Sequence, residues 1–336
     1  MRQYSLLVLT DHAGHSEHNS IYSLLLEMRK NKRCKQIDVA SRSLKANDLF
    51  FEKMAVRSLF AVPVTQNFSF DAGGKHFTQH LRQVRPYAYD AILLRLPHPV
   101  SDAFWSFLET AFPKMLFINQ PSGMRKIGNK AFMLQFPQLC PPMKLCQSLE
   151  EIDAARQQYP IVLKPLFSYG GKGILQIRGE EVLRSEGGKM SFQEFAQAYE
   201  ADPIPYLAVK FLENVDRGDK RLVVCCGEVL GAALRLPAAG SWVCNIAQGG
   251  SSTPATPDDD ELAIIATIDP VLKKNGVVFY GIDTLVDDDG RRKLSEINAL
   301  SIGGLYAMQN EHGIPAAKRA ADLLWNYIHE MHHGEG

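Results

Sequence analysis

The sequence predicts an α/β protein with a parallel sheet in its N-terminal part and an α+β arrangement in its C-terminal part. Three observations lead to this prediction. The chain has 336 residues, more than the roughly 250 to 300 at which a single core stops growing, so more than one domain is expected. Strand-like and helix-like segments alternate near the N-terminus, which is typical of parallel βα units. Further along, short strand-like runs follow one another across tight turns, which is typical of antiparallel pairing.

The N-terminal elements follow from apolar periodicity. Residues 6–10 form a short apolar run that stops at Asp11, and we interpret it as a first strand rather than a cleaved leader. Ser101 precedes an amphipathic run and is a favoured residue for beginning a helix. The elements expected here are strands at 6–10, 37–40, 91–95 and 115–118 and helices at 21–28 and 102–112. Residues 41–85 are predicted only as an irregular excursion. Ligands are expected near the carboxyl ends of the parallel strands.

The C-terminal elements begin after a proline-punctuated boundary. Residues 121–135 have a helical pattern, and Pro137, Pro141 and Pro142 then interrupt it. The elements expected beyond are strands at 159–165, 173–177, 204–212, 221–226, 229–236, 277–286 and 293–298 and helices at 258–275 and 315–331. Residues 237–257 are rich in small residues and proline without any period, so we predict a loop. The predicted domains are 1–121, an α/β substrate domain, then 122–212 and 213–332.

The composition excludes several classes of protein. Lysine plus arginine and aspartate plus glutamate each number 37, so no overall field favours nucleic acid or an anionic membrane. No apolar run approaches the roughly 20 residues that span a bilayer, and a cytoplasmic location is expected. The cysteines are too few and too irregularly spaced for a disulfide framework or a zinc module. They are Cys34, Cys140, Cys146, Cys225, Cys226 and Cys244.

A strand that ends in lysine leads into a glycine-rich turn. Lys164 ends the strand, and Gly170, Gly171, Lys172 and Gly173 follow before the next strand begins. Glycines let backbone amides approach phosphate oxygens, and a lysine supplies a point charge for them. The pattern is neither that of a P-loop nor that of a dinucleotide site. It indicates nucleotide binding, and an ordinary hairpin turn is the alternative.

Three oxygen-bearing side chains lie on two neighbouring strands. Asp283 interrupts an apolar strand, and Glu296 and Asn298 end the next one. Because Glu296 and Asn298 are two residues apart, their side chains leave the same face of the strand. Mg²⁺ prefers a few such oxygens together with phosphates and water. The set therefore predicts a magnesium site, and a buried salt bridge with lysine or arginine is the alternative.

A charged turn opens the strand that begins near residue 219. Residues 217–221 read Arg-Gly-Asp-Lys-Arg, which is typical of a solvated hairpin corner. Beside a bound polyphosphate, Arg221 is instead placed to clamp a transferring phosphoryl group or a substrate carboxylate. Both interpretations remain open from the residues alone.

Taken together and in this order, these segments resemble the ATP-grasp superfamily, and most closely bacterial glutathione synthetases. The similarity runs from the first strand to about Gly304 and is dense after Ile118. It rests on a series of motifs at 163–166, 170–171, 218–221, 235–237, 245, 249–250, 281–283 and 296–298. The fold that it implies is an ATP-grasp fold with an N-terminal parallel-sheet (pre-ATP-grasp) domain.

The resemblance implies an ATP- and Mg²⁺-dependent ligase that activates a carboxylate as an acyl-phosphate and couples it to an amine. By the resemblance, the phosphates of ATP would lie against Lys130 and Lys164, with Gly170, Gly171, Lys172 and Gly173 as a lid. The adenine pocket would be lined by Val209, Lys210, Phe211 and Leu212, with Asp219 near the ribose. Mg²⁺ would be held by Asp283, Glu296 and Asn298. The acyl-phosphate would face Arg221, Arg235 and Asn245, and substrate would meet Arg95 and Ser301.

Two departures from the family bear on the substrates. The family carries an arginine where this chain has Val243, and a threonine-serine-proline run where residues 299–304 of this chain read Ala-Leu-Ser-Ile-Gly-Gly. The resemblance implies small-molecule acid and amine partners, with a small amino acid or a γ-glutamyl peptide on one side. A symmetric homo-oligomer is compatible with it. The alternatives are a ligase that adds an amino acid to a peptide or protein tail and a non-catalytic nucleotide-binding regulator.

Three histidines recur at every third position after the first strand. His12, His15 and His18 lie close to the expected substrate entry. A metal site is conceivable, but a polar loop that meets solvent or an acidic substrate is the simpler interpretation, and we assign these residues no role.

Overall fold

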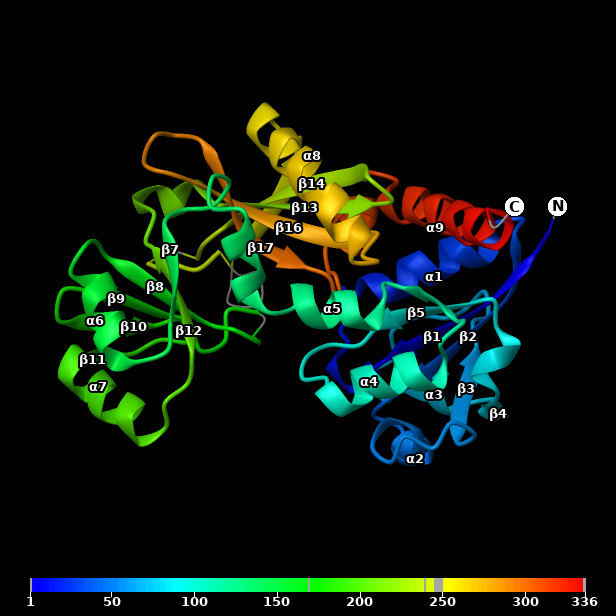
Figure 1. Cartoon of the computed structure of the whole chain (residues 1–336). Coiled ribbons are helices and arrows are strands. Elements are labelled where there is room, and N and C mark those ends of the chain that lie inside the picture. The colour runs from blue at the N-terminus through cyan, green and yellow to red at the C-terminus, as the bar shows by residue number, and fades with distance from the viewer. Residues whose placement is uncertain (1, 169, 239, 245–249, 335–336) are drawn as a thin grey trace.

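Three β-sheets organise the described part of the chain in the computed structural model (Figure 1), which covers residues 2–168, 170–238, 240–244 and 250–334. The first sheet has the strand order β4-β3-β2-β1-β5-β6, the second β11-β10-β9-β8-β12-β7 and the third β15-β14-β13-β16-β17. The third sheet lies between the other two in the view of Figure 1. The fold is therefore mixed α/β, as predicted.

The first sheet is parallel at its centre, where β1 pairs with β2 and β5, and β5 with β6. Its strands are β1 (Tyr4–Thr10), β2 (Cys34–Ser41), β3 (Leu59–Pro63), β4 (Arg82–Val84), β5 (Ala91–Arg95) and β6 (Leu116–Ile118). Its helices are α1 (Ser20–Lys30), α2 (Asp48–Phe51), α3 (Lys75–Thr78), α4 (Asp102–Ala111) and α5 (Pro121–Ile127). Residues of β1 alternate between the cores on its two faces, Leu6 packing with α1 and Leu7 with α4, so both faces are buried. The Ser101 side chain caps α4, as expected.

The second sheet is antiparallel and carries helices on one face. Its strands are β7 (Met143–Cys146), β8 (Ile161–Pro165), β9 (Leu175–Arg178), β10 (Glu181–Arg184), β11 (Lys189–Ser191) and β12 (Tyr206–Lys210). Helices α6 (Leu149–Arg156) and α7 (Phe192–Ala201) pack with Ile161 and Leu163 of β8. Because side chains alternate along a strand, Val162 and Lys164 are left on the opposite face. That face is the one turned to the third sheet.

The third sheet is also antiparallel, and a different helix packs on each of its two faces. Its strands are β13 (Asp219–Cys225), β14 (Glu228–Leu236), β15 (Ser251–Ala255), β16 (Phe279–Val286) and β17 (Arg292–Asn298). Helix α8 (Asp259–Lys274) begins with an Asp258–Glu261 capping box and covers the face of Leu222 and Val224. Helix α9 (Ala316–His333) packs with Val223 and Cys225 on the other face. The rest of that second face, towards the start of β13, carries polar residues.

Helix α9 also fastens the third sheet to the N-terminal sheet. It lies along α1, and the indole Nε1 of Trp325 donates to the Met28 carbonyl oxygen at 2.9 Å. The Tyr4 hydroxyl lies 2.7 Å from His329 Nδ1, and His332 Nε2 lies 2.9 Å from the Asp90 carbonyl oxygen. The last turns of the chain are therefore ordered by contacts that are remote in sequence.

Most predicted elements are present, and the differences have local causes. The predicted helix at 121–135 is divided in two. Helix α5 ends at Ile127 with Gly128 as its C-cap, and residues 130–135 form a separate 3₁₀ helix. Strand β15 lies within the segment 237–257 that was predicted as a loop. The strand is formed by backbone pairing with β14, which does not require a periodic pattern of side chains. The capping box of Ser191 and Glu194 at the start of α7 was a sequence signal that the prediction did not use. The predicted domain boundaries stay predictions. No helix in the described residues is long and apolar enough to cross a membrane.

Candidate active site

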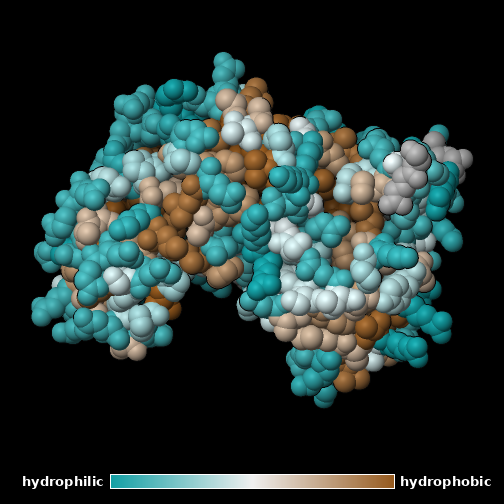
Figure 2. All heavy atoms as spheres, viewed as in Figure 1, coloured by the Kyte–Doolittle hydropathy of each residue, from teal (hydrophilic) through white to brown (hydrophobic). Residues whose placement is uncertain are grey.

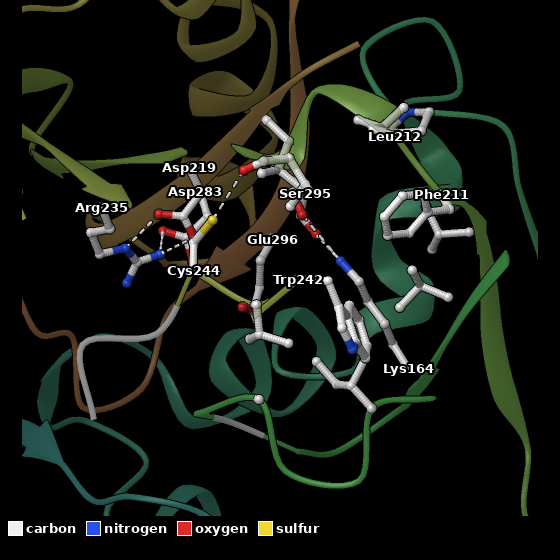
Figure 3. A pocket seen from close by; sticks show the side chains of 18 of the residues that line it. Lys164, Phe211, Leu212, Asp219, Arg235, Trp242, Cys244, Asp283, Ser295 and Glu296 are labelled. Carbon is white, nitrogen blue, oxygen red and sulfur yellow. Dashed lines mark hydrogen bonds and ion pairs between the residues drawn. The ribbon is translucent and has the colours of Figure 1, made fainter. Parts of the chain in front are cut away.

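A cavity opens between the second and third sheets, and Figure 3 shows side chains from both pointing into it. In Figure 2 a notch separates the part of the molecule that contains the second sheet from the N-terminal part. Apolar surface gathers on the side of the second-sheet part that faces the notch. The predicted residues that line the cavity are Lys164, Gly170, Gly171, Val209, Lys210, Phe211, Leu212, Asp219, Arg221, Arg235, Asp283, Glu296 and Asn298. Lys164 belongs to the second sheet and Asn298 to the third, so the cavity forms only when these two sheets pack next to each other.

Strand register brings the acidic and basic groups of the third sheet together. Asp283 of β16 is paired with Glu296 of β17, and Arg221 of β13 is paired with Asp283. A bulge between Asp283 and Thr284 makes Ser295 the additional residue on β17. The bulge keeps Glu296 opposite Asp283 and directs Ser295 towards the second sheet.

Two arginines and two aspartates form a buried ion-pair network at the floor of the cavity. Arg221 donates from both Nε and a terminal nitrogen to Asp283, the latter at 2.6 Å. Arg235 donates to both oxygens of Asp219 at 2.6 and 2.7 Å and lies 3.0 Å from Asp283. Burial disfavours the charge on Asp283, but Arg221 and Arg235 outweigh it and hold its pKa well below the usual range. Burial raises the pKa of Asp219 to about 6. Asp283 is thus the fixed anion of the network.

Two lysines contact neighbouring residues of β17. Lys164 Nζ reaches across from β8 and donates to the carbonyl and hydroxyl oxygens of Ser295, each at 3.1 Å. Lys130 is buried and pairs with Glu296 at 3.2 Å, and it also donates to the Ser168 carbonyl oxygen. Burial lowers the pKa of Lys164. Two cations therefore lie at neighbouring residues of β17, and such a pair of positive charges suits a polyanion.

The remaining wall is apolar and aromatic. Residues 209–212, at the end of β12 and just beyond it, lie along one side. Trp242 lies near Phe211, with ring centroids 6.5 Å apart. The ammonium of Lys210 is turned away to Asp288 at 2.6 Å, so this residue lines the cavity with its backbone and stem. Flat apolar surface beside a polar edge is suited to a heterocyclic base.

The glycine turn lies at the mouth of the cavity. Gly170, Gly171 and Gly173 have φ values of 65°, 76° and 70°, a region that side chains rarely adopt, so these positions favour glycine. The Gly171 carbonyl oxygen accepts from Ser185, and the Gly173 amide donates to Glu186. Gly173 and Lys172 are not among the residues that line the cavity.

A second cavity adjoins the first and belongs to the interface with the N-terminal sheet. Arg221, Glu296 and Asn298 line both cavities. The second cavity is further lined by Gly14, Asn19, Pro97, His98, Gly128, Lys130, Ser168 and the run from Ile297 to Ile302. It includes Ser301, as predicted, beside the apolar side chains of Leu300 and Ile302. The two cavities meet where the cations and carboxylates gather.

Arg95 does not line either cavity, although the sequence prediction gave it a substrate. Its side chain is 2 % exposed, and one terminal nitrogen donates to the Ile302 carbonyl oxygen at 2.6 Å. Among the described residues, the other two guanidinium nitrogens have no hydrogen-bond partner. Burial lowers the pKa of Arg95 to about 10. In this structure Arg95 supports the Ile302 backbone from behind the second cavity.

His15 lies in the same corner and gives a test of acid stability. Burial, with a smaller effect of the Arg95 charge, lowers the pKa of His15 to about 4 from an ordinary value of 6.5. The unfolded chain therefore binds a proton between pH 6.5 and 4 that the folded chain does not, so stability is lost as the pH falls through this window. We expect the melting temperature of the wild type to fall more steeply from pH 6.5 to 4 than that of His15→Gln. Parallel curves would contradict the buried neutral imidazole.

The predicted magnesium ligands are paired with cations here. Among the described residues no group of three or more His, Cys, Asp or Glu side chains is placed to hold a metal ion alone. Asp283 and Glu296 are opposite each other, and the Asn298 amide donates to Asp283 at 3.3 Å. The buried salt bridge that the sequence left as the alternative is present, with Arg221 and Arg235. Two carboxylates and an amide are still the hard oxygen donors that suit Mg²⁺ when phosphates complete its shell.

Sequence reasoning missed several cavity residues. Ser295, Trp242 and Cys244 were not predicted, and Cys244 Sγ lies 3.5 Å from the Val215 carbonyl oxygen. Val243, which stands where the family has arginine, also lines the cavity. The signal for Ser295 was its place beside Glu296, whereas nothing in the sequence indicated Trp242. The predicted Asn245 lies outside the described residues.

Comparisons with known sequences show which family this chain resembles. Residues 129–313 match the family described as prokaryotic glutathione synthetase, ATP-grasp domain. The glutathione synthetase of Bradyrhizobium diazoefficiens is 32 % identical over 261 residues, which cover 76 % of this chain and 79 % of that protein. That of Rhodopseudomonas palustris is 30 % identical over 279 residues, covering 81 % and 85 %.

Solved structures show the same fold over nearly the whole chain. The D-cycloserine synthetase DcsG has a TM-score of 0.66 at 14 % identity and covers 96 % of this chain and 99 % of its own. A D-alanine–D-alanine ligase from Bacillus anthracis in complex with ATP has a TM-score of 0.57 at 13 % identity, covering 99 % and 100 %. At these identities the likeness concerns the fold alone.

Proposed function

Since the chain belongs to the prokaryotic glutathione synthetase family of ATP-grasp enzymes, which are ADP-forming C–N ligases, we propose that it activates a carboxylate as an acyl-phosphate and couples it to an amine. One observation carries this proposal. The cavity between the two lobes and the second cavity meet at Arg221, Glu296 and Asn298. A nucleotide in the first would place its terminal phosphate beside a carboxylate in the second.

The lining residues support this assignment of the first cavity to ATP. Lys164 in the first cavity and Lys130 in the adjoining one would bind phosphate oxygens, with the glycines of 170–173 closing over them. The end of β12 and Phe211 would contact the base, and Asp219 would lie towards the ribose while it holds Arg235. Mg²⁺, when bound by Asp283, Glu296 and Asn298, would neutralise charge on the phosphate oxygens.

The chemistry requires charge stabilisation and positioning rather than a protein nucleophile. A substrate carboxylate oxygen forms a bond to the γ-phosphorus, and the bond to ADP breaks. The amine nitrogen then forms a bond to the acyl carbon, and phosphate leaves. Arg221 is shared by both cavities and is held by Asp283, so it is oriented to stabilise charge on the phosphoryl and acyl oxygens. Arg235 supports the same anion.

We propose small acid and amine substrates, with a small amino acid or a γ-glutamyl peptide on one side. The second cavity offers Asn19 and Ser301 for polar groups and Leu300 and Ile302 as an apolar wall. The apolar wall stands where the family has its threonine-serine-proline run, so the substrate contacts differ there. We also propose a cytoplasmic location, because all six cysteines are free thiols and a reducing compartment maintains them.

The test is phosphate release from Mg-ATP, screened with pairs of acids and amines that include amino acids, dipeptides and γ-glutamyl compounds. We expect one acid with one amine to stimulate release, and Lys164→Met to weaken ATP binding by about 10- to 100-fold, since charged hydrogen bonds are worth roughly 1.5–3 kcal/mol. Lys210→Met is the matched control, because its ammonium is held by Asp288 outside the cavity.

The outcomes separate the alternatives. ATP binding without stimulation by any small-molecule pair would favour a ligase acting on a peptide or protein tail, or a regulator without turnover. Equal losses of ATP affinity in both lysine variants would contradict the placement of the phosphates between the sheets.

A further inference from the structure

The turn between β13 and β14 carries an unusual residue. Cys226 and Gly227 have φ values of 54° and 90°, so both central residues of this hairpin turn are in the left-handed region. Such a turn favours asparagine or glycine at its first position. A cysteine there costs free energy that asparagine would not, and backbone strain of this kind is concentrated at functional sites. The thiol is therefore the feature to explain.

A second thiol is in contact with the first. Cys225 is fully buried at the end of β13, and its Sγ lies 3.8 Å from the Sγ of Cys226, to which it donates. This contact with Cys225, opposed by burial and aided by the charge of Lys273, lowers the pKa of Cys226. Because the thiolate is the reactive form, Cys226 is the more nucleophilic of the two.

Cys226 also lines a surface cavity that is remote from the ATP-grasp site. This cavity lies between α5, the end of α8 and α9, and Lys126, Lys273, Lys274 and Glu330 are among its lining residues. Lys273 also pairs with Asp269 at 2.7 Å. Three lysines against one glutamate in the wall make a place for an acidic molecule, and the half-buried thiol is the reactive atom within it.

We propose that this cavity is a thiol–disulfide exchange site for an acidic low-molecular-weight disulfide, with Cys226 as the attacking thiol and Cys225 as the resolving thiol. The Cys226 sulfur forms a bond to one sulfur of the disulfide RSSR, whose S–S bond breaks to release RS⁻. The Cys225 sulfur then bonds to that of Cys226 and releases the second thiol as RSH, which takes the Cys225 proton. The protein pair is oxidised by two electrons, and the small disulfide is reduced to two thiols.

The site is connected to the catalytic one by a single strand. Arg221 and Cys225 lie on the same face of β13, four residues apart, and α9 packs over the cysteine end. The exchange chemistry needs neither ATP nor Mg²⁺, so its test is independent of the proposed ligase activity.

The experiment treats the full-length protein, without nucleotide, with three small disulfides and follows each cysteine by peptide mass spectrometry. The probes are glutathione disulfide, which is anionic, 2-hydroxyethyl disulfide, which is neutral, and cystamine, which is cationic. Cys34, half-buried at the start of β2, is the internal reference thiol. We expect the 225–226 peptide to lose two hydrogens. Relative to Cys34, its reaction should be about tenfold faster with the anionic than with the cationic probe.

Matched variants identify each sulfur. Cys225→Ala should stop at a mixed disulfide on Cys226, and Cys226→Asn, which suits the turn, should leave Cys225 unreacted in a folded protein. Lys273→Gln should reduce the preference for the anionic probe. A Cys226 that stays reduced while Cys34 reacts, a mixed disulfide that persists in the wild type, or an absence of charge preference would each overturn the proposal.

Discussion

Asp283→Asn is expected to lower kcat by at least about a hundredfold and to destabilise the protein by about 3 kcal/mol. The carboxylate accepts from Arg221 and Arg235 and is 4 % exposed, so its loss leaves buried guanidinium charge without its anion. It also removes a proposed magnesium ligand and the group that orients Arg221. Removal of one preorganised transition-state stabiliser typically lowers kcat by 10² to 10³. Steady-state phosphate release and urea unfolding would measure the two effects.

A control at a second buried ion pair separates stability from turnover. Lys220, the neighbour of Arg221, points to the other face of the sheet and pairs with the fully buried Glu261 at 2.7 Å. Glu261→Gln should therefore destabilise the fold by an amount similar to Asp283→Asn while it leaves kcat within about twofold. If both variants lost turnover in proportion to stability, Asp283 would have only a structural role.

Trp325→Ala is expected to destabilise the protein by about 3–5 kcal/mol. The indole is fully buried between α9 and α1, and its hydrogen bond to the Met28 carbonyl oxygen joins helices that are almost 300 residues apart. The substitution leaves a cavity and removes one of the two hydrogen bonds that the Met28 carbonyl oxygen accepts, the other coming from the Asn31 amide at 3.3 Å. Equilibrium urea unfolding, followed by far-UV circular dichroism, gives the free-energy difference.

The control for Trp325 is Met331, six residues further along the same helix. Met331 is 49 % exposed, so Met331→Ala should change the free energy of unfolding by no more than about 0.5 kcal/mol. A loss below about 1 kcal/mol for Trp325→Ala would mean that α9 is not needed to hold the two sheets together.

Local signals explain what could be predicted. The apolar runs of β1, β5 and β16 and the Ser101 cap depend on neighbours within a few residues, so their pattern is visible in the sequence. The prediction of an irregular excursion at 41–85 missed the short elements α2, β3, α3 and β4. The sequence prediction also missed β7, α6, β10, β11, α7 and β15, and the strands among these are defined by their partners rather than by a period. Most residues of the proposed nucleotide site were found through a resemblance to a family, since no single motif specified them.

The sequence by itself determined the longer elements, the order of the motifs and the residue types that a phosphate-binding ligase needs, because these depend on spacing along the chain. Only the tertiary structure decided their partners. It paired Asp283 with Arg221 and Arg235, brought Lys164 of one sheet to Ser295 of another, buried Arg95 behind the second cavity and placed Cys226 beside three lysines. Each of these contacts joins segments remote in sequence, and their geometry depends on the register and packing of whole sheets, which local pattern does not encode.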